Sequence, residues 1–252
     1  MSFFRADDLS ISFGGIRALS GLSLSVARGE VFAIIGPNGA GKTTLFNAVT
    51  RVLDVESGTI SIDGVDITRL PRHQIVHHGI ARTFQNIELF ERATVLENLL
   101  LGRHRYPAGN LFSQLLFTPA VRRAEVAARE KAEDIIELLE LQPYRHAPVS
   151  GLPYGVRKVV ELGRALATDP RLLLLDEPAS GLNPEETRDL SFWIEDMRSD
   201  LDMTVIMIEH DMSLVSEVAD RVLVMNQGCL LGEGTPDEVR RNPDVIAAYL
   251  GG

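Results

Sequence analysis

The stretch VFAIIGPNGAGKTT (31–44) decides the fold. Its first five residues are continuously apolar, which is typical of a strand buried on both faces of a parallel sheet. The next eight match the pattern G-x-x-x-x-G-K-[ST], with Gly36, Gly41, Lys42 and Thr43 in the fixed positions, and Thr44 follows. A helix with apolar periodicity is expected from about 42 to 52. Strand, glycine-rich loop and helix, in this order, predict a phosphate-binding loop in an α/β fold.

The chemistry of this loop follows from its residue types. Glycines allow successive backbone N–H groups to turn inward around an anion, helped by the positive end of the following helix. The Lys42 ammonium is suited to the β- and γ-phosphates, and the Thr43 hydroxyl is suited to Mg²⁺. The residues predicted to bind the nucleotide from this loop are Gly36, Asn38, Gly39, Gly41, Lys42, Thr43 and Thr44.

A second apolar run, LLLLDEP (172–178), ends in two carboxylates. A strand that ends in Asp176 places a carboxylate at the sheet edge, where it can hold the magnesium shell. The neighbouring Glu177 can then polarise a water molecule in line with the γ-phosphate. The pair narrows the field of phosphate-loop proteins to those that hydrolyse the nucleotide.

Hydrophobic patterning divides the remainder of the chain. Alternating residues predict strands at 9–13 and 22–26, and Asp63-Gly64 predicts the turn of a hairpin over 57–67. From about 70 to 160 the pattern is helical, with amphipathic stretches at 94–101 and 121–141. Strands are expected again at 172–176, 204–208 and 221–225, and helices after Pro184 and at 212–219. A helical block therefore interrupts an α/β domain.

Composition limits the function. The net charge of −10 argues against a dedicated nucleic-acid binder, which is normally basic. The longest apolar runs are about five residues, whereas a membrane span needs about 20. The N-terminal stretch MSFFRADDLS has acidic residues where a signal peptide has a basic start and an apolar stretch. The chain has a single cysteine, Cys229. We therefore expect a cytoplasmic location.

In the light of these motifs, the chain resembles the ATP-binding subunits of ABC transporters over essentially its whole length. Phe13 stands where the family has an aromatic that stacks on adenine, and Gln85 in RTFQN (82–86) matches the glutamine that touches magnesium and water. LPYGV (152–156) takes the place of the family signature, before a helix expected at 157–167. SGLN (180–183) resembles the loop that crosses between two subunits, and His210 in IEHDM (208–212) matches the switch histidine.

The resemblance implies a P-loop NTPase (RecA-like) core with an antiparallel β subdomain and an inserted α-helical subdomain. The core is expected at 1–85 and 160–236, the helical signature subdomain at 86–159 and a C-terminal helix at 237–252. ATP and Mg²⁺ are the implied cofactors. Glu177, His210 and Gln85 are the implied catalytic residues, and Thr43, Gln85 and Asp176 the implied metal residues. Gly155, at the start of the signature helix, is expected to face the nucleotide held by a partner subunit.

Two departures from the family pattern concern the contacts between subunits. The usual signature reads LSGGQ, whereas this chain has Pro153 and Val156. The crossing loop ends in Asn183 in place of the usual Asp. Backbone N–H groups at 155 and 156 remain, so we expect the contact between subunits to rest on backbone donors. Neither departure removes Glu177.

Several segments resemble one subgroup, the ATPases of branched-chain amino acid importers and their urea and amide relatives. These segments are RTFQNIELF (82–90), a stretch at 102–119, LPYG, EHDM and the tail 232–251. The implied partners are membrane permease subunits, an identical or related second ATPase and, indirectly, an extracytoplasmic binding protein, at the cytoplasmic face of the membrane. The stretch 102–119 is either a contact with these subunits or lipid, or a surface helix. The alternatives are a lipopolysaccharide-type exporter ATPase, a soluble ABC ATPase acting on ribosomes or DNA, and a nucleotide-sensing module without turnover.

Overall fold

The protein is described here from a computed structural model that covers residues 2–85, 87–103 and 118–250. The chain divides into two compact units, which we call the core unit (1–85 and 171–252) and the helical unit (86–170). The first boundary follows Gln85. The second lies at Pro170 and not at 159, because the helix over 154–166 packs on the other helices of the helical unit.

A six-stranded sheet forms the centre of the core unit, with the strand order β10-β9-β3-β8-β7-β6. Its strands are β3 (Val31–Ile35), β6 (Ile80–Arg82), β7 (Leu172–Asp176), β8 (Thr204–Ile208), β9 (Arg221–Asn226) and β10 (Cys229–Gly234). All neighbours pair in parallel except β10, which is antiparallel to β9. Every residue of β3, β7 and β8 is buried, as continuous apolar runs predict. The carboxyl ends of β3, β7 and β8 therefore meet at one edge.

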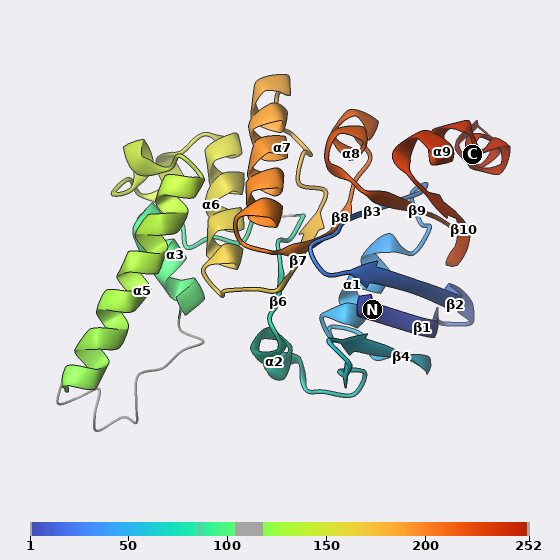
Figure 1. Cartoon of the computed structure of the whole chain (residues 1–252), viewed down its shortest axis with the longest axis horizontal. Helices are drawn as coiled ribbons and strands as arrows, with labels where there is room; N and C mark the ends of the chain where they lie inside the picture. The colour runs from blue at the N-terminus through green and yellow to red at the C-terminus, as the bar shows by residue number, and fades with distance from the viewer. Residues whose placement is uncertain (1, 86, 104–117, 251–252) are drawn as a thin grey trace. The chain divides into compact units, whose positions relative to one another are not determined.

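A second, antiparallel sheet has the strand order β2-β1-β4-β5. Its strands are β1 (Ser2–Phe13), β2 (Ile16–Ala27), β4 (Ser57–Ile62) and β5 (Val65–Asp66). Asp63 and Gly64 both have positive φ between β4 and β5, which confirms the predicted hairpin turn. Helix α1 (Lys42–Val49) lies between the two sheets (Figure 1), and its Leu45 and Phe46 share one buried cluster with residues of both sheets.

The remaining helices of the core unit flank the six-stranded sheet and its ends (Figure 1). They are α2 (Arg72–Ile75), the 3₁₀ turn η1 (Val76–His78), α7 (Pro184–Ser199), α8 (Met212–Val218), α9 (Pro236–Arg241) and α10 (Pro243–Leu250). The tail contains two short helices where the sequence suggests one. The break falls at Asn242, because the next residue is a proline, which begins a helix more readily than it continues one.

The helical unit contains α3 (Val95–Gly102), α5 (Pro119–Leu138) and α6 (Tyr154–Leu166), with 3₁₀ turns η3 (Gln142–Tyr144) and η4 (Val149–Gly151). Helices α3 and α6 approach closely at Gly102, where an added Cβ would lie 2.5 Å from the Arg164 carbonyl oxygen. Most of the 102–119 stretch lies outside the described residues. Among those described, no helix is long and apolar enough to cross a membrane.

Candidate functional site

The phosphate loop joins β3 to α1 and depends on glycine at particular positions. Gly36 has φ 149°, and an added Cβ would lie 2.1 Å from the Met225 carbonyl oxygen. Gly41 has φ 98°, and its Cβ would lie 2.4 Å from the Ala18 carbonyl oxygen. A side chain at either position would force the loop away from strands β9 and β2. At the loop tip, Asn38 and Gly39 are exposed.

Helix α1 begins at Lys42 directly after the left-handed Gly41. The amide groups of the first turn have no partner within the helix, so those of Lys42, Thr43 and Thr44 are available to an anion. Thr43 is exposed and Thr44 half-buried. The structure thus gives the predicted loop the backbone geometry of a phosphate site.

The Lys42 ammonium group is buried and points back over the loop. Nζ donates to the carbonyl oxygens of Gly36, at 2.7 Å, and Pro37, at 3.0 Å. Burial lowers the pKa of Lys42, and the nearby carboxylates of Glu177 and Asp176 oppose that shift. A bound phosphate would offer Lys42 a charged partner in place of two neutral carbonyls.

Asp176 ends strand β7 and is held by a buried arginine. Arg82 Nη2 donates to Asp176 Oδ2 at 2.6 Å, and the two side chains are 5% and 4% exposed. The other terminal nitrogen of Arg82 donates to Asn47 Oδ1 of α1 at 2.7 Å. Arg82 therefore ties β6 to α1 and β7, and fixes the orientation of the Asp176 carboxylate.

Glu177 follows with φ 51°, a left-handed conformation that is unusual for a residue other than glycine. Its amide donates to the Ile208 carbonyl at 2.9 Å, so the chain turns sharply at the end of β7. Gln85 Nε2 donates to Glu177 Oε2 at 3.0 Å, and His210 Nε2 lies 3.0 Å from Glu177 Oε1. The three residues predicted to be catalytic are thereby brought together at one carboxylate.

Thr43 and Asp176 provide the oxygen donors that Mg²⁺ prefers. Within the described part of the chain, no cluster of three or more His, Cys, Asp or Glu side chains could hold a metal by itself. That donor set fits an ion held partly by nucleotide phosphates and water. Arg82 occupies Asp176 Oδ2, so the ion would be reached through Oδ1 or through a water molecule.

The comparisons with known proteins agree with this geometry. A sequence family described as "ABC transporter" matches residues 19–180. The branched-chain amino acid transport ATP-binding protein BraF of Pseudomonas aeruginosa is 46% identical, covering 96% of this chain and 95% of that protein. This chain belongs to the ABC transporter family. It is an ATPase and the ATP-driven subunit of a transporter.

Other relatives of the cassette point the same way. LivG of Escherichia coli, also described as a branched-chain amino acid transport ATP-binding protein, is 44% identical over the same share of each chain. The ADP conformation of an ABC transporter cassette superposes with a TM-score of 0.87 at 34% identity, covering both chains completely. A second family, described as "Branched-chain amino acid ATP-binding cassette transporter", matches residues 229–252.

Phe13 belongs to the core unit and Gly155 to the helical unit. Phe13 ends β1 and is 47% exposed, so its ring is accessible to an adenine. Gly155 lies in the first turn of α6, in the helical unit. Helix α6 begins at Tyr154, three residues earlier than predicted, with Pro153 as its N-cap. Proline offers no side-chain cap, so the first amides of α6 keep their free donors.

Asn183 replaces the aspartate of the family pattern without loss of the local structure. Its side-chain oxygen accepts from the amides of Glu185 and Glu186, at 2.9 and 3.0 Å, and the Glu186 side chain accepts from the Asn183 amide. This capping box begins α7. Asparagine caps a helix about as well as aspartate does, so the departure keeps the cap of α7.

Two residues of the cassette site were not predicted from the sequence. Arg82 and Glu209 stand inside the quoted motifs RTFQN and IEHDM, but no role was assigned to either. Both are charged residues at the end of an apolar strand. That position could have indicated a role, because a buried charge requires a partner.

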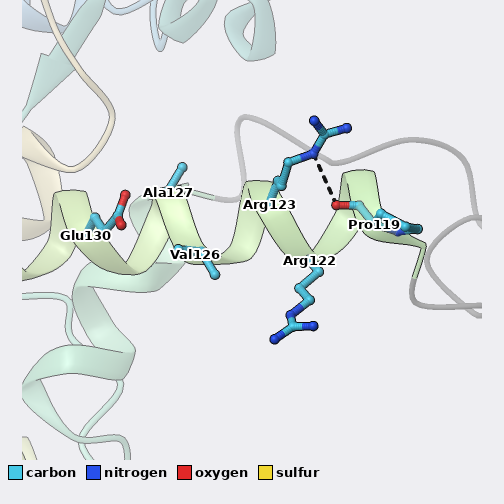
Figure 2. A pocket seen from close by; sticks show the side chains of 6 residues that line it. All are labelled: Pro119, Arg122, Arg123, Val126, Ala127 and Glu130. Atoms are coloured by element: carbon cyan, nitrogen blue, oxygen red, sulfur yellow. Dashed lines mark hydrogen bonds between the residues drawn. The ribbon is translucent and has the colours of Figure 1, made fainter.

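A hollow of about 620 Å³ runs along α5 in the helical unit (Figure 2). It is lined by Pro119, Arg122, Arg123, Val126, Ala127 and Glu130. Arg122 and Arg123 extend to opposite sides of the helix, and Arg123 Nε donates to the Pro119 carbonyl at 3.3 Å. None of the residues predicted to bind nucleotide, metal or water lines it.

Proposed function

We propose that this ATPase cleaves MgATP with Glu177 as the general base and powers the import of branched-chain amino acids. The observation that carries the proposal is the Glu177 carboxylate, held by Gln85 and His210 at 3.0 Å each beside the Lys42 ammonium. A base for hydrolysis must lie in line with the γ-phosphate, and two neighbours that grip both its oxygens keep it there.

The groups around Glu177 divide the work of hydrolysis. Loop amides and Lys42 bind the β- and γ-phosphates, and Phe13 stacks on the adenine. Glu177 accepts a proton from the attacking water while Gln85 orients that water. His210 Nε2 lies 3.0 Å from Glu177 Oε1. When ATP is bound, the N–H group of this nitrogen turns to donate to a γ-phosphate oxygen. Bound Mg²⁺ neutralises phosphate charge, and Thr43, Gln85 and the Asp176 shell would hold it.

The proposal includes a second cassette. The first amides of α6, including that of Gly155, have free donors at the positive end of a 13-residue helix. Such a helix end attracts the γ-phosphate of a nucleotide bound to a partner cassette. ATP thereby links two cassettes, identical or related, and hydrolysis separates them.

The transported molecule is proposed from the relatives and the tail. Relatives with identities of 44–46% are branched-chain amino acid transport proteins, and the family match at 229–252 carries the same description. Membrane permeases and an extracytoplasmic binding protein would complete the transporter, with the cassette on the cytoplasmic face of the membrane. The binding protein and the permeases select the transported molecule.

Glu177→Gln tests the chemistry. We expect the variant to bind ATP with unchanged affinity, to lose turnover by at least about 100-fold, and to form a stable ATP-bound dimer on size-exclusion chromatography. Undiminished turnover would remove Glu177 from the base role.

The transported molecule requires a separate experiment. Proteoliposomes that contain the cassette with its membrane permeases should accumulate radiolabelled leucine when ATP and the binding protein are present. Outward movement of a lipid, or no stimulation by any branched-chain amino acid, would refute the substrate assignment and leave the ATPase chemistry intact.

A further inference from the structure

Glu209 is a buried carboxylate that the proposed chemistry does not use. It follows strand β8 directly, precedes His210, and is 3% exposed, and its side chain reaches the segment that follows Glu177. A buried ionised carboxylate is costly unless hydrogen bonds satisfy it. Its partners are therefore informative about its role.

Three backbone amides donate to this carboxylate. Oε1 accepts from the amide of Ala179 at 2.7 Å. Oε2 accepts from the amides of His210, at 2.8 Å, and Asp211, at 3.2 Å. One oxygen thus holds the segment after β7, and the other holds the segment after β8. Hydrogen bonds to an ionised group are stronger than neutral ones, so this bridge is stiff.

The bridge spans the pair at the centre of the site. Ala179 lies two residues after Glu177, and the Glu177 amide bonds to the Ile208 carbonyl next to Glu209. His210 follows Glu209 immediately, and its Nε2 lies 3.0 Å from Glu177 Oε1. The backbone positions of both residues are therefore set by one carboxylate.

We infer that Glu209 is a positioning residue for hydrolysis, which fixes His210 against Glu177. The inference rests on the proposed roles of Glu177 and His210. Glutamine has the size of glutamate but offers one acceptor oxygen and one donor group. Whichever way its amide is turned, the donor group faces backbone N–H groups, and the bond to one of the two segments is lost.

The experiment compares Glu209→Gln, His210→Ala and the double variant by steady-state ATP hydrolysis of the full chain. A misplacement of about 1 Å in an active site costs about 100-fold, so we expect Glu209→Gln to lower kcat by about 10- to 100-fold with an unchanged KM for ATP. In the His210→Ala background the same change should have little further effect, because its target is gone.

Glu30→Gln is the matched control. Glu30 is also buried, accepts from a backbone amide, that of Ala27, and pairs with Arg221, but it lies at the opposite end of β3 from the phosphate loop. We expect its kcat to remain at the wild-type level. Hydrogen-exchange mass spectrometry should show faster exchange over 177–183 and 208–213 in Glu209→Gln and not in Glu30→Gln.

Each failure has its own signature. A wild-type kcat for Glu209→Gln, or an equal loss in the presence and absence of His210, would overturn the inference while the proposed chemistry stands. Wild-type turnover of His210→Ala alone would overturn the proposed role of His210 and, with it, the route through which Glu209 acts. If His210→Ala turns over too slowly to be compared with the double variant, hydrogen exchange decides. Unchanged exchange at both segments in Glu209→Gln would refute the bridge formed by the Glu209 carboxylate.

Discussion

Replacing Arg82 by methionine should destabilise the core unit, because it leaves the buried Asp176 carboxylate without its partner. The Arg82–Asp176 pair is 2.6 Å long with both side chains at most 5% exposed. Removing one partner of such a pair typically costs about 3–5 kcal/mol. Lys42 still attracts Asp176 in the variant, which places the expected loss near the lower end, at about 3 kcal/mol.

The expected loss in the free energy of unfolding can be measured as a decrease in the melting temperature, Tm. For a chain of this size, 1 kcal/mol shifts Tm by about 2–4 °C, so about 3 kcal/mol predicts a decrease of about 6–12 °C by differential scanning calorimetry. The double variant Arg82→Met/Asp176→Asn should melt higher than Arg82→Met alone, since no unpaired charge remains.

The Arg5–Asp7 pair provides a matched control at the surface. Its Nε–Oδ2 distance is 2.7 Å, close to that of the buried pair, but its side chains are 58% and 40% exposed. Exposed pairs contribute about 0–1 kcal/mol, so Arg5→Met should lower Tm by less than about 4 °C. If Arg82→Met also stayed within that range with its circular dichroism intact, the assignment of a large energy to the buried pair would be refuted.

Lys42→Ala should weaken ATP binding by about 10- to 100-fold in a fluorescent-nucleotide titration, because charged hydrogen bonds to phosphate are lost; unchanged affinity would contradict the role of Lys42. Phe13→Ala should raise the KM for ATP about fivefold or more with kcat preserved, since stacking on adenine is the same in the ground and transition states, and a fall in kcat alone would count against it. Burial raises the pKa of Asp169, but its salt bridges to Arg103, at 2.5 Å, and Lys131, at 3.0 Å, outweigh burial and hold that pKa below 3.8. The stabilisation from these salt bridges is present above pH 3.8 and is lost as the pH falls through the lowered pKa. Asp169→Asn should therefore lower Tm near neutral pH, and the difference in Tm from wild type should shrink as the pH is lowered below 3.8. A difference in Tm that stays constant with pH would show that ionisation of Asp169 is not involved.

The features encoded in short, continuous stretches were predictable from the sequence. The phosphate loop depends on glycine spacing over nine residues, and β7 is read from four leucines followed by Asp176 and Glu177. The turn at Asp63-Gly64 is equally local. The family resemblance implied catalytic roles for Gln85, His210 and Glu177 but not the contacts between them. That Gln85 and His210 both meet the Glu177 carboxylate comes from the structure, since these residues are far apart in the chain.

Other features were decided by the tertiary structure. The Arg82–Asp176 bond joins residues 94 positions apart, and the bond from Ala179 to Glu209 spans 30. The break in the tail at Asn242 and the early start of α6 also differ from the sequence pattern. A sequence motif determines which chemical groups lie close together along the chain, within a few residues of one another. Which buried charge meets which amide depends on the register of parallel strands, and only the assembled sheet sets that register.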